Sequence, residues 1–245
     1  DLERDPLVRW QHRYYVWIGV LAGLVLPAVI GWFWGGGEAA WGAFLLAGVA
    51  RTVSVHHSTF FINSLCHTMG KQPYSDRCTA RDHWLMAFFT FGEGYHNFHH
   101  AFQHDYRNGV KAWQFDPTKW TIWFLSKIGL TSNLRRVPDE RIRHAEITEQ
   151  QRQLAAKMAV MTAASVAKVR VQLDAVQARL HEAFAHWEKL ELEYRRAMEK
   201  KLESSREKLH ELSQEFREAR EKLVAAFHEW EHAHSSALTA LLAAA

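Results

Sequence analysis

Three histidines stand close together in the stretch GEGYHNFHH, residues 92–100, at His96, His99 and His100. On a helix, residues three and four apart project from the same face, so one surface can present all three imidazoles. Neutral imidazole is a good ligand for iron, zinc, copper or nickel. With few cysteines and few carboxylates nearby, the pattern favours an all-nitrogen metal site over a solvated histidine-rich turn.

Two further positions could contribute to such a site. Asn63 and His67 are four residues apart, so they would project together from one helical face. Glu93 stands between two glycines immediately before the histidine triplet. It could orient a metal-bound imidazole, as carboxylates near metal sites usually do, or it could be a turn carboxylate without that role.

The elements that must hold these side chains begin with an uncharged run. Tyr14–Trp34 contains 21 residues without a charge, and a helix of that length matches a hydrocarbon core of about 30 Å. After the turn GGGE, residues 39–67 are long enough to return across the membrane, although they include Arg51. We therefore expect an all-α integral membrane protein with two transmembrane helices in this region.

Charge asymmetry predicts how these helices are oriented. Basic residues flank the outer ends of both spans, whereas the turn between them carries only Glu38. These flanking residues are Arg4, Arg9 and Arg13 before the first span and Lys71, Arg77 and Arg81 after the second. The positive-inside rule then puts both ends and the histidines on the cytoplasmic face of a multi-pass protein, in a bacterial inner membrane or its equivalent.

Composition changes near the segment RRVPDER. Residues 1–137 are aromatic and apolar, whereas residues 138–245 are dominated by Glu, Lys, Arg, Ala, Gln and Leu, as in long solvated helices. We expect two domains divided at this point. The net charge of +3 is too small, and basic blocks too few, to indicate a nucleic-acid partner. Only two cysteines are present, which favours a reducing compartment.

The segment FDPTKWTIWFLSKIGL predicts a short helix between the histidines and the tail. Asp116 is the expected N-cap and Pro117 the first helical residue. Its aromatic face could lie in the membrane interface or pack beneath a cytoplasmic cap, and the sequence leaves both open.

The tail shows a heptad pattern. The apolar positions are Leu173, Leu180, Trp187 and Tyr194, then, after a step of eight, Leu202, Leu209, Phe216, Leu223 and Trp230. This pattern predicts a coiled coil, either continuous or broken near a capping box at Ser204 and Glu207 into a helical hairpin. Such a tail could self-associate or dock a partner. We slightly prefer a hairpin folded on itself, because two runs of similar length can cover each other's apolar stripe.

NSLCHTMGKQPYSD and GEGYHNFHHAFQHDYR closely resemble the membrane-bound acyl desaturases of the stearoyl-coenzyme A desaturase type. DLERDPLVRWQHRYY resembles the segment that leads into the third membrane helix of that family. The resemblance covers residues 1 to about 137. It implies a cytoplasmic histidine-box site with two irons, held by about nine histidines.

By residue match, the resemblance implies that His67, His96 and His100 are ligands of one iron and His99 of the other. It implies that Asn63 approaches an iron through a water. It further implies that dioxygen and two electrons, from a ferredoxin-type or cytochrome donor, serve to remove two hydrogens from a saturated acyl-CoA or lipid acyl chain, most often at carbons nine and ten. Iron and dioxygen suit an unactivated carbon–hydrogen bond, whereas zinc is redox-silent.

The chain departs from the family pattern in one respect. Two further histidine boxes precede the matched segment in the family, and neither occurs between Asp1 and Arg51. We therefore expect the C-terminal half of a desaturase, a piece of something longer that is inactive alone. The alternatives are a histidine-box hydroxylase and a non-catalytic membrane protein with an assembly-mediating tail.

Overall fold

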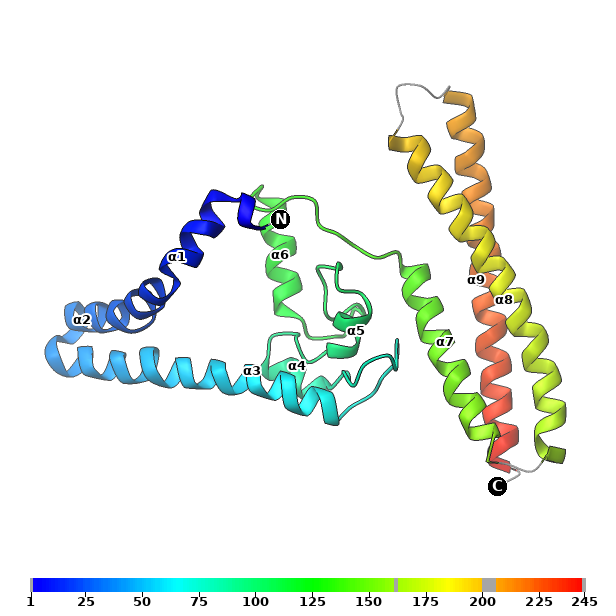
Figure 1. The fold of residues 1–245 in the computed structure, drawn as a ribbon, viewed down its shortest axis with the longest axis horizontal. Helices are drawn as coiled ribbons and strands as arrows, with labels where there is room; N and C mark the ends of the chain where they lie inside the picture. Colours follow the sequence, from blue (N-terminus) through cyan, green and yellow to red (C-terminus); the bar gives the residue numbers. More distant parts are fainter. Residues whose placement is uncertain (1, 161–162, 200–205, 244–245) are drawn as a thin grey trace. The chain divides into compact units, whose positions relative to one another are not determined.

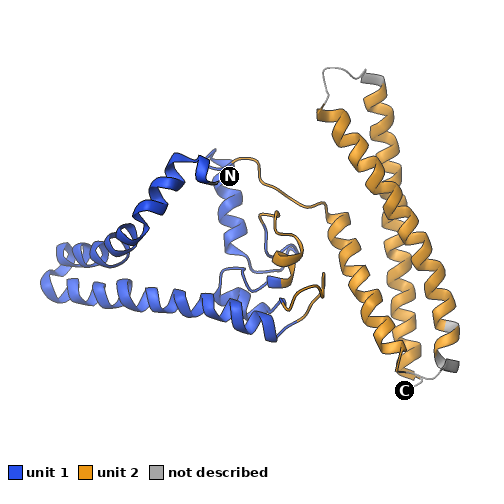
Figure 2. Cartoon of the chain, viewed as in Figure 1, with its two compact units in different colours: residues 1–70, 80–96, 107–131 blue, residues 71–79, 97–106, 132–245 orange. Residues whose placement is uncertain are grey.

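The computed structural model describes residues 2–160, 163–199 and 206–243. The described part is helical, with an isolated bridge between Asp82 and Tyr95 and no named strand. This confirms the expected all-α class. The chain forms two compact units (Figure 2): unit 1 comprises Asp1–Gly70, Ala80–His96 and Arg107–Thr131, and unit 2 comprises Lys71–Thr79, Asn97–Tyr106 and Ser132–Ala245.

Unit 1 begins with a long helical run that folds back on itself (Figure 1). After the short turn η1 (Leu2–Arg4), its successive segments are α1 (Pro6–Val20), η2 (Leu21–Val25), α2 (Leu26–Ala43), η3 (Phe44–Ala50) and α3 (Arg51–Thr68). The reversal lies within α2, where Gly35 and Gly36 leave helical geometry. Gly36 has φ +70°, a conformation that glycine adopts without strain.

Small residues let the two arms of this hairpin approach closely. A Cβ on Gly31 would lie 2.5 Å from the Ala39 carbonyl oxygen. A Cβ on Gly48 would come close to the side chain of Leu24 on the other arm. Arg51 bonds its own helix at the Ala47 carbonyl oxygen (2.8 Å) and reaches the Gly23 carbonyl oxygen of the other arm at 3.4 Å. Arg51 thus donates hydrogen bonds to carbonyl oxygens of both arms, which provides partners for a charged side chain in an apolar segment.

Residues Pro6–Thr68 are apolar and long enough to cross a membrane, and only 6% of their most apolar 18-residue window is buried inside the protein. By length and composition they are a membrane-spanning candidate. Their exposed surface carries large apolar side chains, such as Trp32 (61% exposed) and Leu46 (74% exposed). This surface suits hydrocarbon and is costly in water.

The rest of unit 1 is a compact cap containing α4 (Trp84–Phe89) and α6 (Pro117–Lys127). α6 begins as predicted, because Asp116 accepts a hydrogen bond from the Lys119 amide at 2.8 Å and Pro117 is its first residue. Between α4 and α6, α5 (His96–Ala101) carries the histidine triplet.

Unit 2 contains three tail helices, α7 (Asp139–Met158), α8 (Ala163–Glu199) and α9 (Arg206–Ala243). α8 and α9 run side by side as a hairpin (Figure 1), which is the preferred of the two tail predictions. Heptad residues Leu180, Trp187, Leu223 and Trp230 are each at most 1% exposed in its core. Leu202 and the Ser204 of the predicted capping box lie outside the described residues, and supercoiling of the hairpin stays a prediction.

The composition of the tail did not predict that α7 is a separate helix packed on the hairpin. α7 is tied to the hairpin by Trp230, whose Nε1 donates to Gln150 Oε1 at 3.1 Å, and by the pair Arg141 with Glu191 at 2.8 Å. Glu140 pairs with Arg220 in the same interface. These acidic residues are buried and paired, although the composition alone had suggested a solvated face.

Candidate metal centre

The first histidine of the candidate site lies near the end of a long helix, and the second begins a short one. His67 is in the last turn of α3, and His96 is the first residue of α5. The turn before His96 is fixed against α4, because the His83 amide donates to the Gly94 carbonyl oxygen at 2.8 Å. Gly94 leaves no room for a side chain: a Cβ would lie 2.1 Å from the Ala87 nitrogen. Glycine here allows the turn before His96 to pack closely on α4.

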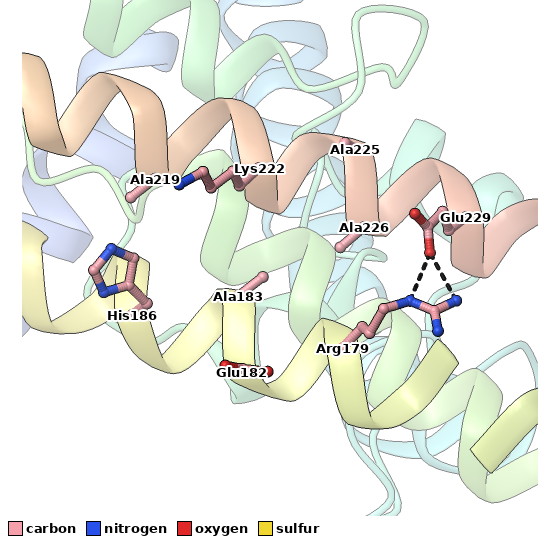
Figure 3. Close-up of a pocket in the computed structure, with 9 residues that line it drawn as sticks. All are labelled: Arg179, Glu182, Ala183, His186, Ala219, Lys222, Ala225, Ala226 and Glu229. Carbon is pink, nitrogen blue, oxygen red and sulfur yellow. Dashed lines mark hydrogen bonds and ion pairs between the residues drawn. The ribbon is translucent and has the colours of Figure 1, made fainter. Parts of the chain in front are cut away.

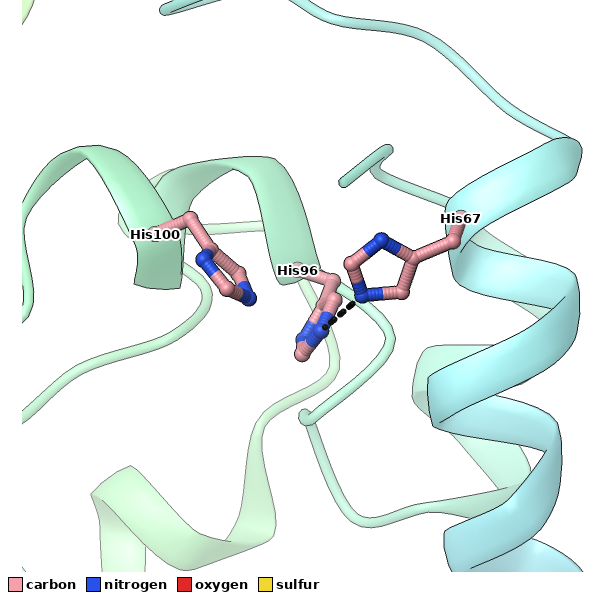
Figure 4. Close-up of side chains that lie close together, drawn as sticks. All are labelled: His67, His96 and His100. Carbon is pink, nitrogen blue, oxygen red and sulfur yellow. Dashed lines mark hydrogen bonds between the residues drawn. The ribbon is translucent and has the colours of Figure 1, made fainter. Parts of the chain in front are cut away.

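Three imidazoles meet at this point (Figure 4). His96 Nε2 lies 3.1 Å from His67 Nε2, and the two rings are 4.9 Å apart in an edge-on arrangement. His100 follows His96 by four residues on α5, which brings it onto the same helical face. One ligand nitrogen from each of the three histidines lies within 4.8 Å of the other two.

This donor set fits a transition metal. Two ring nitrogens 3.1 Å apart form a hydrogen bond when one carries a proton and the other offers its lone pair. A metal would take the lone pair of each neutral imidazole instead, and imidazole suits iron, zinc, copper and nickel. His96 is 7% exposed, so the centre of the cluster is largely sheltered from solvent.

The other predicted site residues have different surroundings. The His99 ring lies 5.8 Å from the His100 ring, and His99 is not in the group of three. Asn63 is exposed, and its Nδ2 donates to the Thr59 carbonyl oxygen of its own helix at 3.0 Å. The roles expected for these two residues stay predictions.

Glu93 belongs to a polar chain beneath the turn. Its Oε1 accepts from Asn108 Nδ2 at 2.9 Å, and the Asn108 amide donates to Asp116 Oδ2 at 2.9 Å. Asp116 is fully buried and also accepts from the amides of Gly109 and Lys119, both at 2.8 Å. Burial lowers the pKa of Lys119, and Asp116 partly opposes this shift. A role for Glu93 in orienting an imidazole stays a prediction.

Asn97 is a residue of the motif that the sequence did not single out. It is fully buried, and its amide group bonds the backbone of residues 74 and 75. An asparagine between two histidines has no periodicity that would identify such a role.

A cavity of about 520 Å³ in unit 2 borders the last of the three histidines. Its other walls come from the end of α5, the linker to the tail, α7 and α8. The residues lining it are His100, Ala101, Phe102, Gln103, His104, Arg136, Val137, Pro138, Arg141 and Arg195. The arginines are engaged by carboxylates, as in the Arg136 pair with Asp139 at 2.8 Å. The tail therefore helps to shape the surroundings of His100.

A second hollow, of about 540 Å³, lies between α8 and α9 (Figure 3). Its floor is formed by alanines such as Ala183 and Ala226, and Arg179 pairs with Glu229 across it at 3.0 Å. No group of three metal-ligating side chains was found there among the described residues. We therefore interpret this hollow as a solvated groove between two helices.

Comparison with known proteins shows what this chain is similar to. The family model for fatty acid desaturases matches residues 2–127. The probable acyl-CoA desaturase of Schizosaccharomyces pombe is 42% identical over 155 residues, covering 63% of this chain and 32% of that protein. Acyl-CoA desaturase 1 of Saccharomyces cerevisiae is 42% identical over 160 residues, 65% of this chain and 31% of that protein.

The chain is also similar to a protein whose name refers to a lipid-bound acyl chain. The sn-1 stearoyl-lipid 9-desaturase of Anabaena variabilis is 34% identical over 135 residues, 55% of this chain and 46% of that protein. The chain thus spans about a third of the length of the two yeast relatives. Their matched stretches must include residues beyond Val137, because only 137 residues precede Pro138.

Proposed function

The chain belongs to the fatty acid desaturase family, and we propose that it is part of a membrane-bound acyl desaturase. The reaction is the dioxygen-dependent introduction of a cis double bond into a saturated acyl-CoA or lipid acyl chain. The names of the relatives, acyl-CoA desaturases and stearoyl-lipid 9-desaturases, support this reaction and a Δ9 position. The activity belongs to a longer protein, which supplies the two histidine boxes that this chain lacks.

The observation that carries the proposal is the meeting of His67, His96 and His100 within 4.8 Å. In our proposal these three residues bind one iron of a di-iron centre and His99 binds the second. Asn63 contributes through a water, and Glu93 orients an imidazole. Bound iron, together with dioxygen, supplies the oxidant that an unactivated carbon–hydrogen bond requires.

In this proposal the residues of this chain bind the metal and limit the access of water to it. Each of the three imidazoles offers one ring nitrogen to the metal. The close contact of Gly94 with α4 fixes the start of α5. Because His96 is buried, water is restricted at the centre of the cluster.

The surroundings follow from the same proposal. In this proposal the chain crosses the membrane twice within Pro6–Thr68, the protein is multi-pass, and the histidines lie on the cytoplasmic face; the apolar composition of this run and the basic residues that flank it support this. The acyl substrate comes from the lipid phase, and a ferredoxin-type or cytochrome donor supplies electrons. We place the boundary between the desaturase part and the tail at Val137, and self-association through the tail is a further part of the proposal.

Product analysis tests this function. The longer protein that contains this chain is expressed in a host without its own desaturase, and the fatty acids are identified by gas chromatography and mass spectrometry. We expect a cis-Δ9 product that disappears in the variant His96→Ala and persists in His104→Ala, whose imidazole is exposed and outside the cluster. A hydroxylated chain would indicate the hydroxylase alternative. No new product with correctly inserted protein would favour a non-catalytic role.

A further inference from the structure

Helix α5, which carries the histidine motif, is only six residues long. Isolated helices shorter than about 12–15 residues are marginal in water, so α5 depends on tertiary contacts for its formation and direction. The contacts that supply this support determine where its imidazoles point.

The strongest of these contacts is made by Asn97. Its Oδ1 accepts hydrogen bonds from the amides of Tyr74 (2.9 Å) and Ser75 (3.3 Å), and its Nδ2 donates to the Ser75 carbonyl oxygen at 2.7 Å. The side chain is fully buried. Asn97 follows His96 directly and precedes His100 by three residues, so these bonds fix the helix that carries both imidazoles.

Aromatic packing supports the same junction. The Tyr74 ring lies 5.3 Å from Phe98 and 5.9 Å from Phe102, edge-on in both cases. Phe98 is 1% exposed. The segment 71–79, called here the brace loop, therefore holds α5 by both polar and apolar contacts.

The brace loop is in turn held by the tail helix α7. Arg152 Nε lies 3.1 Å from Asp76 Oδ2, and Gln153 Nε2 donates to the Gln72 carbonyl oxygen at 3.4 Å. Arg152 is itself aligned by Glu149, which accepts from its Nε at 2.9 Å and its Nη2 at 2.7 Å. The hydrogen bond from Arg152 lowers the pKa of Glu149, so this carboxylate stays charged near neutral pH.

The other end of the motif segment is tied to the start of the tail. Asp105 Oδ2 accepts from the Val137 amide at 2.9 Å, and the Tyr106 amide donates to the Arg135 carbonyl oxygen at 3.0 Å. The histidine helix is thus supported on one side through the brace loop and on the other through the linker. α7 lies beyond the residues that the desaturase family model matches.

We propose that Asn97 is a positioning residue for the metal centre, and that α7 acts through Arg152 and the brace loop to hold α5 in its ligating orientation. The proposal rests on the proposed metal-binding function and assigns the first part of the tail to it. In this role Asn97 is not itself a metal ligand, and it acts by fixing the helix on which His96 and His100 stand.

The test uses the longer protein, purified in detergent with iron, and measures two quantities. One is the rate at which a chelator removes the iron. The other is amide hydrogen exchange in residues 71–79 and 96–101. For Asn97→Ala we expect iron loss to accelerate at least about tenfold, as for removal of other groups that orient metal ligands, together with faster exchange in both segments. Asn97→Asp keeps the two accepted bonds and should recover part of the loss.

Phe227→Ala is the stability control, because Phe227 is buried in the core that α8 and α9 share. It should lower the melting temperature without accelerating iron loss at temperatures where the protein is folded. Iron retention by Asn97→Ala equal to that of the wild type, with unchanged exchange in α5, would overturn the positioning role.

A second pair of variants tests the brace without touching the motif. Asp76→Asn removes the ion pair with Arg152 and leaves the bonds between Arg152 and Glu149, so it should accelerate exchange in the brace loop by about two- to fivefold, the range expected for one exposed ion pair. Arg179→Leu removes an exposed pair of similar exposure on the hairpin and should leave it unchanged. Equal exchange rates of the brace loop in the two variants would contradict its support by α7. This comparison still tests the proposal if Asn97→Ala does not fold. A wild type that binds no iron would refute the metal function, while the exchange data would still judge the support of α5.

Discussion

The N-terminal helices and the tail both fold back as antiparallel helical hairpins, but they bury opposite kinds of surface. The hairpin of residues 6–68 packs glycines and alanines against each other and leaves its large apolar side chains outside. The α8–α9 hairpin places Leu180, Trp187 and Trp230 inside and most of its charged residues outside, Glu191 being a buried exception. The first arrangement is stable in hydrocarbon and the second in water. The face that carries the large apolar side chains therefore indicates whether a hairpin is stable in hydrocarbon or in water.

The largest expected effect comes from removing a core aromatic of the tail. Trp230→Ala should lower the free energy of unfolding of the tail by about 3–5 kcal/mol, because it opens a cavity and removes the bond to Gln150. Trp32→Ala, at a 61% exposed position of the first hairpin, is the matched control. Denaturant unfolding followed by circular dichroism measures the effect of Trp230→Ala. Resistance to unfolding in mixed micelles measures the effect of Trp32→Ala. Equal losses would break the comparison.

A charge placed on the outside of each hairpin should act in opposite ways. Leu46→Lys, at a position 74% exposed, should cost about 3 kcal/mol of membrane insertion if the proposed membrane spans are correct, because the side chain would then face hydrocarbon. Val171→Lys, at a position 72% exposed on α8, should change stability by less than about 0.5 kcal/mol. A glycosylation-based insertion assay and thermal unfolding report the two effects. Normal insertion of Leu46→Lys would argue against a lipid-facing surface.

The close approach of the two arms of the first hairpin gives a smaller effect. Gly31→Val should destabilise the first hairpin by about 1–3 kcal/mol, because a Cβ there lies 2.5 Å from the Ala39 carbonyl oxygen. Gly42→Val is the control, since nothing lies within 4 Å of a Cβ at that position. Unfolding in sodium dodecyl sulfate compares them. If the two variants unfold alike, the arms do not pack through Gly31.

The smallest effect is a pH dependence confined to the tail. Burial, with a smaller contribution from His181, lowers the pKa of His144 to about 4, and its ring stacks on Phe184 at 3.6 Å. Between about pH 6.5 and 4 the unfolded chain binds a proton that the folded chain does not, so stability falls as the pH falls through this window. Comparing melting temperatures at pH 7 and 5 should show a weaker dependence in His144→Leu than in the wild type. An unchanged dependence would refute this assignment.

The regular elements could be predicted from the sequence because each depends on local pattern. The uncharged run, the Asp116 cap and the heptads determine their helices from neighbouring residues alone.

Contacts between distant segments could not be predicted in this way. Spacing showed that His96 and His100 share a face, but only the family resemblance joined His67 to them. Their meeting depends on the turn at Gly94 packing on α4 and on the brace loop, neither of which has a periodic signature. The separation of α7 and the burial of Glu140 escaped prediction for the same reason, because Arg220, the partner of Glu140, lies on another helix.

The central claim is that His67, His96 and His100 hold iron in the longer protein. Its most direct measurement is the iron content per chain of purified wild type, His96→Ala and His104→Ala, with spectroscopy of the bound metal. The account predicts that the wild type and His104→Ala hold the same amount of iron and that His96→Ala loses it. Iron content unchanged by His96→Ala, in a folded protein, would contradict it.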